Sequence, residues 1–409
     1  MYKIALDLAL KSLMRRKTRT LMVIMMIALS LSGLLFLQGL YDGMVSHMIN
    51  TTIRSDSGDI SLYAKQYRFE KNIDYHIDDP EPIQAYLYQS EEINAYAVRL
   101  MQEGLVSTAH KSLGATLRGV TLEDERKFGD FYTFLSQGKF SFGPKNQDAL
   151  IGFKLAEKLK VTLGSRLIFT AQDANGEINA IAFRISGIVK TGNLTIDEGS
   201  VFVSMETMER FLTLPNSATQ IALRVKDESQ IKSVQDTLQK KFKTLDVLRW
   251  DELYPLLIQM REMMNIFNWV SYAIVFAVAA LGIFGVILMS ILERMREFSI
   301  MMAIGTPYRN IRYQIISEAF AMALFGYVFG ALLGWGFLLY TASVGIDLRY
   351  FEAGLESFGL NAILYADIRY YYFFQAFAAV FFATFLSVLW PLHVLKKIKP
   401  IEVIQGKML

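Results

Sequence analysis

The segment "ERMREFSIMMAIGTPYRNIRYQIISEAF" (residues 293–320) places charge between two long apolar runs. Its apolar and charged residues recur at helical spacing on different sides, which predicts an amphipathic helix at a membrane face. The apolar side holds Ile291, Met295, Phe298 and Met302, and the charged side holds Glu293, Arg296 and Glu297. Gly305 fits the position after a helix end where the backbone takes positive φ. Thr306 is expected to cap a second helix that has Pro307 at its first position.

Four runs are long and apolar enough to cross a bilayer, which takes roughly 20 helical residues. They cover 20–41, 266–292, 319–346 and 370–395, and none contains Asp, Glu, Lys or Arg. A charge at the centre of a span costs about 2.5 to 3.5 kcal/mol on insertion scales, so four uncharged runs predict four transmembrane helices.

Cationic residues flank these runs unevenly. They gather in the leader 1–19, in the connection 293–318 and in the tail 396–409, whereas the connection 347–369 has only Arg349 and Arg369. The positive-inside rule therefore puts both termini and 293–318 in the cytoplasm, and residues 42–265 outside. A cleaved signal peptide is the competing interpretation of the first run, but that run is longer than a typical signal-peptide core, so an uncleaved span is favoured.

The region 42–265 has the pattern of an α+β domain. Strand-like alternation is found at 58–64, 95–102, 114–120, 166–171, 180–189, 200–205 and 220–225. Helical periodicity is found at 81–90, 152–160 and 228–243. Asn175-Gly176 predicts a hairpin with a type I′ turn. A long helix is predicted to begin near Asp251, giving a stalk (251–265) that runs into the second span without Gly or Pro between 256 and 281.

Several functions lack the residues they need. The chain has 409 residues, a formal net charge of +3 and no cysteine, so disulfides, thiolate metal sites and nucleic-acid binding are not indicated. The histidines (His47, His76, His110 and His393) have no partner at metal-ligand spacing, and Asp78, Asp79 and Glu81 fit a loop before a helix. The P-loop pattern G-x-x-x-x-G-K-[ST] is absent, so the chain is not expected to be an enzyme that hydrolyses ATP.

A stripe of glycines marks the third span. Gly326, Gly330 and Gly334 recur every four residues, which predicts close packing against another helix, either in the same subunit or across a dimer. For 293–304 two roles also remain open on the residues alone: anchoring a loop at lipid headgroups, or docking a cytoplasmic partner.

Four stretches resemble the ABC transporter permease superfamily that includes MacB, LolC, LolE and FtsX. "ERMREFSIMMAIGTPYRNIRYQIISEA" resembles its E-x-x-R-E-F/I-G-x-x-x-A-x-G segment, with Ser299 where Gly is usual. "ALKSLMRRKTRTLMVIMMIALSLS" looks like its basic leader and first span, and "PLHVLKKIKPIEVIQG" like its closing segment, with Ile404 in place of Leu. "LIGFKLAEKLKVTLGSRLIF" resembles a stretch of its outer domain, with Ser165 in place of Asp.

The resemblance implies a membrane protein of the inner membrane with four transmembrane helices and a large outer α+β domain between the first two. That domain would have a Porter-like part (46–122 plus 216–250) and a Sabre-like part (123–215). The family works as dimers, so a second permease copy or a homologous permease is expected. A separate cytoplasmic ATPase dimer would bind ATP and Mg, and this chain itself would hold no cofactor.

The resemblance also assigns residues to the coupling helix that contacts the ATPase: Glu293, Arg294, Arg296, Glu297, Phe298, Met301, Ala303 and Gly305. ATP-driven closure would move this helix, and the motion would reach the outer domain. Lipoproteins or other amphiphiles are the expected substrates, extracted from the outer leaflet, with membrane lipids around the spans. The alternative is an FtsX-like signalling subunit that activates an outer hydrolase without transport. The hairpin at 166–185 is short and lacks the Pro found in chaperone-recruiting LolC proteins.

Overall fold

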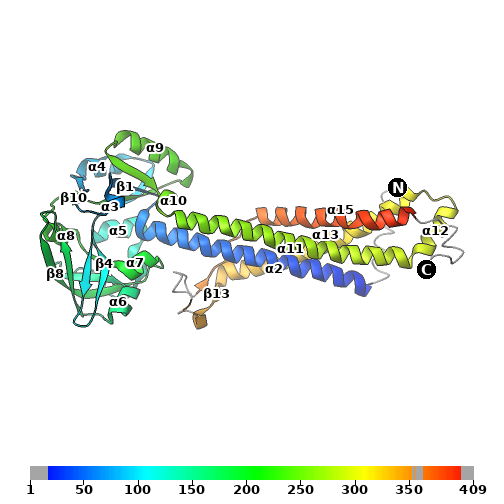
Figure 1. The fold of residues 1–409 in the computed structure, drawn as a ribbon, viewed down its shortest axis with the longest axis horizontal. Helices are drawn as coiled ribbons and strands as arrows, with labels where there is room; N and C mark the ends of the chain where they lie inside the picture. Colours follow the sequence, from blue (N-terminus) through cyan, green and yellow to red (C-terminus); the bar gives the residue numbers. More distant parts are fainter. Residues whose placement is uncertain (1–16, 352–353, 355–362, 398–409) are drawn as a thin grey trace. The chain divides into compact units, whose positions relative to one another are not determined.

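The computed structural model describes residues 17–351, 354 and 363–397. They form two compact units, traced in Figure 1. The helical unit takes its described residues from 1–44, 260–348 and 363–409, and the sheet unit from 45–259 and 349–362. The expected leader at 1–16, the end of the tail at 398–409, and 352–353 with 355–362 of the connection 347–369 lie outside the described residues.

Among the described residues, four helices are long and apolar enough to cross a membrane, as predicted. They are α2 (Lys17–Thr52), α11 (Pro255–Glu293), α13 (Tyr308–Val344) and α15 (Tyr371–Lys397). The third span ends two residues earlier than expected, because α13 stops at Val344 and Gly345 takes a φ of 77° that L residues rarely adopt. Short β13 (Ile346–Asp347) and β14 (Ile363–Leu364) pair after it.

The sheet unit is built on one ten-stranded mixed sheet. Its strands are β1 (Ile60–Ala64), β3 (Ile93–Ser107), β4 (Ser112–Val120), β5 (Leu135–Gly138), β6 (Asp148–Gly152), β7 (Arg166–Gln172), β8 (Ile178–Val189), β9 (Ser200–Ser204), β11 (Gln220–Val225) and β12 (Leu245–Arg249). Their order is β12-β1-β11-β3-β4-β9-β6-β8-β5, and β7 pairs with β3 and β8. The pairs β4–β9 and β6–β8 are parallel, and the remaining pairs are antiparallel. A separate pair joins β2 (Ile77–Asp78) to β10 (Ser217–Ala218).

Short helices surround this sheet. They are α3 (Tyr67–Glu70), α4 (Glu81–Gln89), α5 (Leu122–Gly129), α6 (Phe153–Leu159), α7 (Leu194–Gly199), α8 (Met205–Leu212), α9 (Ile231–Lys241) and α10 (Trp250–Leu253), with single turns η2 (Phe131–Phe134) and η3 (Glu228–Gln230). The helix α2 ends in a π-helical turn, η1 (Ile53–Ser57). Alternation of apolar and polar residues identified seven of the strands, whereas the brief amphipathic patterns of α5 and α8 went unrecognised.

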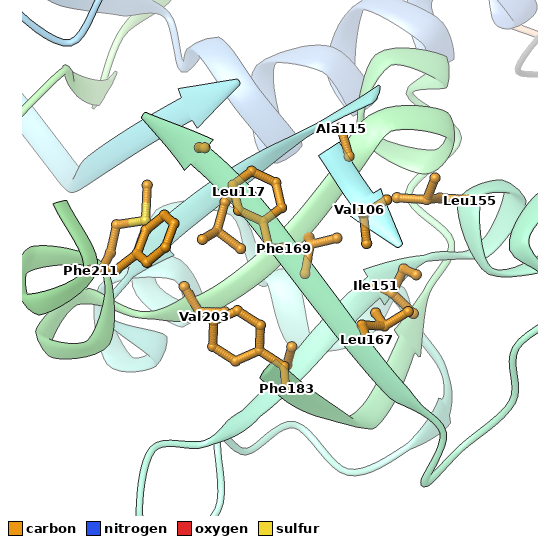
Figure 2. Packing of buried hydrophobic residues seen from close by; sticks show 14 of the residues in the cluster. Val106, Ala115, Leu117, Ile151, Leu155, Leu167, Phe169, Phe183, Val203 and Phe211 are labelled. Carbon is orange, nitrogen blue, oxygen red and sulfur yellow. The ribbon is translucent and has the colours of Figure 1, made fainter. Parts of the chain in front are cut away.

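The largest core of the sheet unit combines strands from both halves of its sequence. Figure 2 shows Leu117 of β4, Phe169 of β7 and Val203 of β9 packed in one cluster, which also holds Leu155 of α6 and Phe211 of α8. The parallel pairing of β4 with β9 places Leu117 opposite Val201. The predicted Porter-like and Sabre-like parts therefore share one continuous sheet, and the boundaries proposed between them stay predictions.

The hairpin at Asn175-Gly176 forms, but its turn differs from the predicted type I′. Only Gly176 has positive φ (85°), and the loop covers the five residues between Gln172 and Ile178. The Asp173 carboxylate organises it by accepting from the backbone N–H groups of Asn175 and Glu177, both at 2.9 Å. An Asx-type turn thus replaced the expected two-residue turn.

The stalk helix begins later than expected. The prediction of one long helix from near Asp251 into the second span was wrong, because the helix that begins at Trp250, α10, ends at Leu253 and α11 starts anew at Pro255. Tyr254 between them has φ −121° and ψ 66°. A proline disfavours helical backbone in the residue before it and fits the first position of a new helix, which explains the break.

Candidate functional site

The segment singled out in the sequence forms the short helix α12 (Met295–Ala303) between α11 and α13. Its end has the hydrogen bonds of a Schellman motif: the Gly305 N–H donates to the Met302 carbonyl (3.1 Å), and the Thr306 N–H to the Met301 carbonyl (2.9 Å). Gly305 has a φ of 98°, which confirms its predicted role at this turn.

The start of the next helix is shifted by one residue from the prediction. Pro307, with φ −68° and ψ 140°, is the cap residue of α13, and Tyr308 is its first helical residue. Thr306 is therefore not the cap, and its N–H belongs to the preceding turn, where it donates to the Met301 carbonyl. The extended ψ of Pro307 turns the chain into α13.

Arg294 lies at the junction of α11 and α12 and fixes both to α13. Its guanidinium donates from Nε to Glu297 (3.2 Å) and its Nη1 lies 3.7 Å from the carboxylate of buried Glu318. The same guanidinium lies 4.8 Å from the centre of the Phe298 ring. Glu293, one residue earlier, pairs with Arg19 of α2 at 3.5 Å. These contacts hold α12 in one orientation on the helical unit.

Two residues of α12 face the interior of the helical unit. Phe298 is 1% exposed and packs in a cluster with Ile291 of α11 and Ile311 of α13. Ser299 is fully buried, and its hydroxyl has no hydrogen-bond partner among the described residues. Phe298 thus anchors the helix, and its side chain is not available to a docking partner in this conformation.

The opposite side of α12 is open. Arg296 and Glu297 are exposed, as are Ala303 and Gly305 at the end of the helix, whereas Met301 is only half-buried. Two apolar residues that the sequence did not single out, Ile300 (47% exposed) and Ile304 (77% exposed), lie on this side as well. Their spacing from Arg296, four and eight residues, could have revealed them as members of the same helix face. We call Arg296, Glu297, Ile300, Ala303 and Ile304 the α12 outer face.

The glycine stripe of α13 packs against α2 within the same chain. A Cβ at Gly330 would lie 2.9 Å from the Cα and the carbonyl oxygen of Ala28, and one at Gly326 would lie 2.9 Å from Ile27. At Gly334 the nearest atom, on the Leu35 side chain, would be 3.0 Å away. Of the two alternatives that the sequence left open, the structure shows the intramolecular contact, with small residues allowing close backbone approach.

A network of buried charges lies in the sheet unit where η1, β3, β4 and α5 meet. Arg99 of β3 binds the Glu125 carboxylate through Nε (2.5 Å) and Nη2 (2.9 Å), and both residues are 1% exposed. Arg118 of β4 donates to Asp56 of η1 at 2.6 Å. Asp56 also accepts from the Tyr254 hydroxyl, so this carboxylate of η1 joins β4 to the residue before α11.

The surroundings of Arg99 and Tyr254 in this network shift the pKa values of both side chains. Burial alone would lower the pKa of Arg99, but the adjacent Glu125 carboxylate more than offsets this and raises that pKa above its usual range. Burial also raises the pKa of Tyr254 well above its ordinary value, so its hydroxyl stays protonated and donates. No sequence pattern indicates this cluster, because Arg99 and Arg118 occupy strand positions that a polar residue normally turns toward solvent.

No group of three metal-ligating side chains occurs in the described ranges. His76 instead places Nε2 2.8 Å from the Asp78 carboxylate, and Asp79 accepts from Asn216 at 2.8 Å. These acidic residues are held by local polar contacts before α4 begins at Glu81.

The chain has the architecture of a membrane protein with four spans. It has a large α+β unit between the first two apolar helices and a short amphipathic helix between the second and third. The chain belongs to the family of FtsX-like permeases with a MacB-like periplasmic core domain. The model described as "FtsX-like permease C-terminal" matches residues 269–400, and "MacB-like periplasmic core domain" matches residues 20–241. It is thus an ABC transporter permease, and both matches cover permease segments.

Curated relatives agree with this family. The chain is 23% identical over 285 residues to the lipoprotein-releasing system transmembrane protein LolC of Neisseria meningitidis, which covers 67% of each chain. It is 25% identical over 223 residues to the macrolide export ATP-binding/permease protein MacB of Bdellovibrio bacteriovorus, covering 50% of this chain and 34% of that protein. The chain thus spans about a third of that MacB protein.

A solved structure is similar over part of the chain. The periplasmic region of MacB from Actinobacillus actinomycetemcomitans aligns with a TM-score of 0.34 and 17% identity, covering 50% of this chain and 95% of that one. Because this TM-score is low, the family assignment rests on the two family models and the four apolar helices.

Proposed function

We propose that this chain is the permease subunit of an ATP-driven transporter whose separate cytoplasmic ATPase docks on the α12 outer face. Both termini and α12 lie in the cytoplasm, and residues 42–265 lie outside, in accordance with the cationic flanks of the spans. The observation that carries this proposal is the contrast within α12: Phe298 is 1% exposed, whereas Ile300 and Ile304 are 47% and 77% exposed.

This contrast suits a helix that receives force from a partner. A docking element must be fixed to its own subunit, and the contact of Arg294 with Glu318 of α13 and the burial of Phe298 supply that attachment. It must also offer a surface, and exposed isoleucines beside charges resemble the apolar centre and polar rim of protein interfaces. The finer assignment of the ATPase contact to Arg296, Glu297 and Ala303 is part of this proposal.

Motion of α12 would reach the sheet unit through the chain itself. The helices α2 and α11 each contain residues of both units. At their ends inside the sheet unit, Asp56 and Tyr254 share a hydrogen bond. Coupling of this kind needs two packed arrangements whose balance ATP shifts, and linkage then requires substrate outside to change nucleotide affinity inside.

The partner ATPase dimer supplies the ATP and Mg sites in this proposal, and a second permease copy or a homologous permease completes the complex. The substrate is a lipoprotein or another amphiphile, taken from the outer leaflet. Two observations support this substrate class: the similarity to a lipoprotein-releasing LolC protein, and four predicted spans without Asp, Glu, Lys or Arg, charges that a conduit for polar solutes usually carries.

Co-purification with the ATPase encoded by the neighbouring gene tests the docking face. Glu297→Lys combined with Ile300→Ser changes two exposed side chains and should reduce the bound ATPase about tenfold or more, since interface hot spots contribute at least about 2 kcal/mol. Glu228→Lys, an equal charge reversal at an exposed position of the sheet unit, is the matched control. Wild-type recovery of the ATPase by the double variant would contradict docking at this face.

Phe298→Ala is unsuited to this experiment. The Phe298 ring is buried against α11 and α13, so its removal would disturb the packing of the helical unit together with any docking. Truncating a buried Phe costs about 3 to 5 kcal/mol, a loss that would obscure the effect on the ATPase.

A further inference from the structure

The sheet unit has a cavity of about 420 Å³ lined by residues 145–147, β8 and α8, and a second cavity whose lining combines aromatic rings with charged side chains. This second cavity has a volume of about 320 Å³ and lies between η1, α3, β3, β4 and the residues before α11. All of its lining residues belong to the sheet unit. None of them is among the residues assigned above to ATPase docking.

One wall of this cavity is aromatic. Tyr63 and Tyr67 stack with ring centres 6.2 Å apart and an angle of 11° between their planes. The Tyr67 hydroxyl donates to the Met101 carbonyl (3.2 Å), the Tyr63 hydroxyl accepts from Gln220 (2.9 Å), and the Tyr254 hydroxyl donates to Asp56. Because these hydroxyls are already engaged with the protein, the tyrosines offer ring surface to a ligand.

The cavity lining carries one more positive than negative charge. Its cationic side chains are Arg68, Lys71 and Arg118, and its anionic side chains are Asp56 and Glu103. Arg118 pairs with Asp56 at 2.6 Å, and Lys71 pairs with Glu103 at 2.5 Å. Arg68 donates only to backbone carbonyls, those of Glu252 (3.4 Å) and Leu253 (2.9 Å), and meets no carboxylate in the described part of the chain.

We infer that this cavity binds a single-chain anionic amphiphile, with its acid group at Arg68 and its apolar chain against the Tyr63 and Tyr67 rings. Arginine binds carboxylate and phosphate groups through charge-assisted hydrogen bonds, and its charge here is not neutralised by the protein. The apolar side chains of Met101 and Leu253 extend the wall that would receive the chain. This binding does not depend on transport or on ATPase docking.

The size of the cavity selects a probe. Liquid water takes about 30 Å³ per molecule, so 320 Å³ accommodates roughly ten to fifteen non-hydrogen atoms. Decanoate has this size and carries one negative charge. Decanol and decyltrimethylammonium have the same apolar chain with no charge and with a positive charge, so they separate recognition of the anion from simple apolar partitioning.

The experiment uses the full chain in phosphatidylcholine nanodiscs and exploits the lack of cysteine in the sequence. Thr116→Cys places a single thiol on the cavity wall, and its rate of reaction with a small maleimide reports access. Decanoate should slow this reaction at least fivefold, while decanol and decyltrimethylammonium should leave it unchanged at equal concentration. A thiol at exposed position 233, from Ser233→Cys, serves as the control that no probe protects.

Arg68→Gln should weaken protection by decanoate about tenfold, and Arg68→Lys should keep most of it. Because Arg68 also holds two carbonyls, Lys71→Gln provides a second variant that lowers the cavity charge without touching those contacts, and it too should weaken protection. Equal protection by all three probes, protection that survives both Arg68→Gln and Lys71→Gln, or no protection by decanoate would each overturn the inference.

Discussion

The contact between α13 and α2 yields a prediction for Gly330→Ala. The added Cβ would lie 2.9 Å from the Cα and carbonyl oxygen of Ala28, whereas carbon atoms prefer separations of about 3.5 to 4.0 Å. The obstructing atoms belong to the backbone of α2, so no side-chain rotation can relieve the clash. The two helices must separate by about 0.5 to 1 Å, and such overpacking costs about 1 to 3 kcal/mol.

Gly336→Ala is the matched control in the same helix. No atom lies within 4 Å of a Cβ built at Gly336, so this variant gains helix propensity, about 0.5 to 1 kcal/mol, without a clash. The propensity gain is common to both variants, so the difference between them isolates the overpacking term. Gly330→Ala should therefore be about 1 to 3 kcal/mol less stable than Gly336→Ala.

The assay is unfolding of the purified chain in one detergent, followed by SDS titration and by thermal scanning. Gly334→Ala should fall between the two variants, because its nearest neighbour is the flexible end of Leu35 at 3.0 Å. Equal midpoints for Gly330→Ala and Gly336→Ala would refute the reasoning. The glycine stripe would then have to meet another partner, such as a second copy of the chain.

Three further predictions concern buried and paired polar groups. Ser299→Ala should raise the thermal midpoint, because it removes a fully buried hydroxyl that has no hydrogen-bond partner among the described residues. Burying such an unsatisfied group costs about 1 to 3 kcal/mol, whereas Ser233→Ala at an exposed position should change the midpoint little. Glu125→Gln should destabilise the chain by about 3 to 5 kcal/mol, because the buried Arg99 guanidinium loses the carboxylate that it binds through two hydrogen bonds and keeps only that of Asp56, 3.7 Å away. Arg99→Met with Glu125→Leu should recover part of the loss in the same thermal scan, and a double variant no more stable than the single one would contradict this. Arg249 holds the pKa of Asp251 below its usual value through a side-chain hydrogen bond, so the stability from this pair is present above the unfolded pKa of about 3.9 and is lost as the pH falls through the depressed folded value. Asp251→Asn should accordingly lower the midpoint at neutral pH but not near pH 2, and a pH-independent difference would argue against the pair.

The sequence predicts those parts of the fold that depend on local pattern. The four spans follow from uninterrupted apolar runs, and the Schellman turn follows from Gly305, the residue best suited to its φ of 98°. Pro255 also indicates the break before α11, because a proline disfavours helical backbone in the residue before it, here Tyr254, although the long periodic pattern favoured one continuous helix. Local rules therefore sufficed where one residue sets the backbone.

Long-range contacts could not be predicted in the same way. Phe298 was predicted on the apolar side of an amphipathic helix and, through the resemblance, among the residues that contact the ATPase. It is buried against α11 and α13, a result that depends on how three helices meet. Arg99 and Glu125 lie 26 positions apart and read as ordinary polar residues until the sheet brings them together. The sequence likewise predicted only part of the candidate docking face. Ile300 and Ile304 can be assigned to it only when the exposure of their side chains is known.

The central claim is that force from a cytoplasmic ATPase enters this permease through α12 in order to move an amphiphile. The most direct measurement is ATP hydrolysis by the reconstituted complex in nanodiscs, with and without a triacylated lipoprotein, for the wild-type permease and for Glu297→Lys with Ile300→Ser. The account predicts stimulation by lipoprotein with its release into solution in the wild type, and loss of both in the variant. Stimulation that is unchanged in the variant, or an intact and active wild-type complex that ignores the lipoprotein, would contradict it.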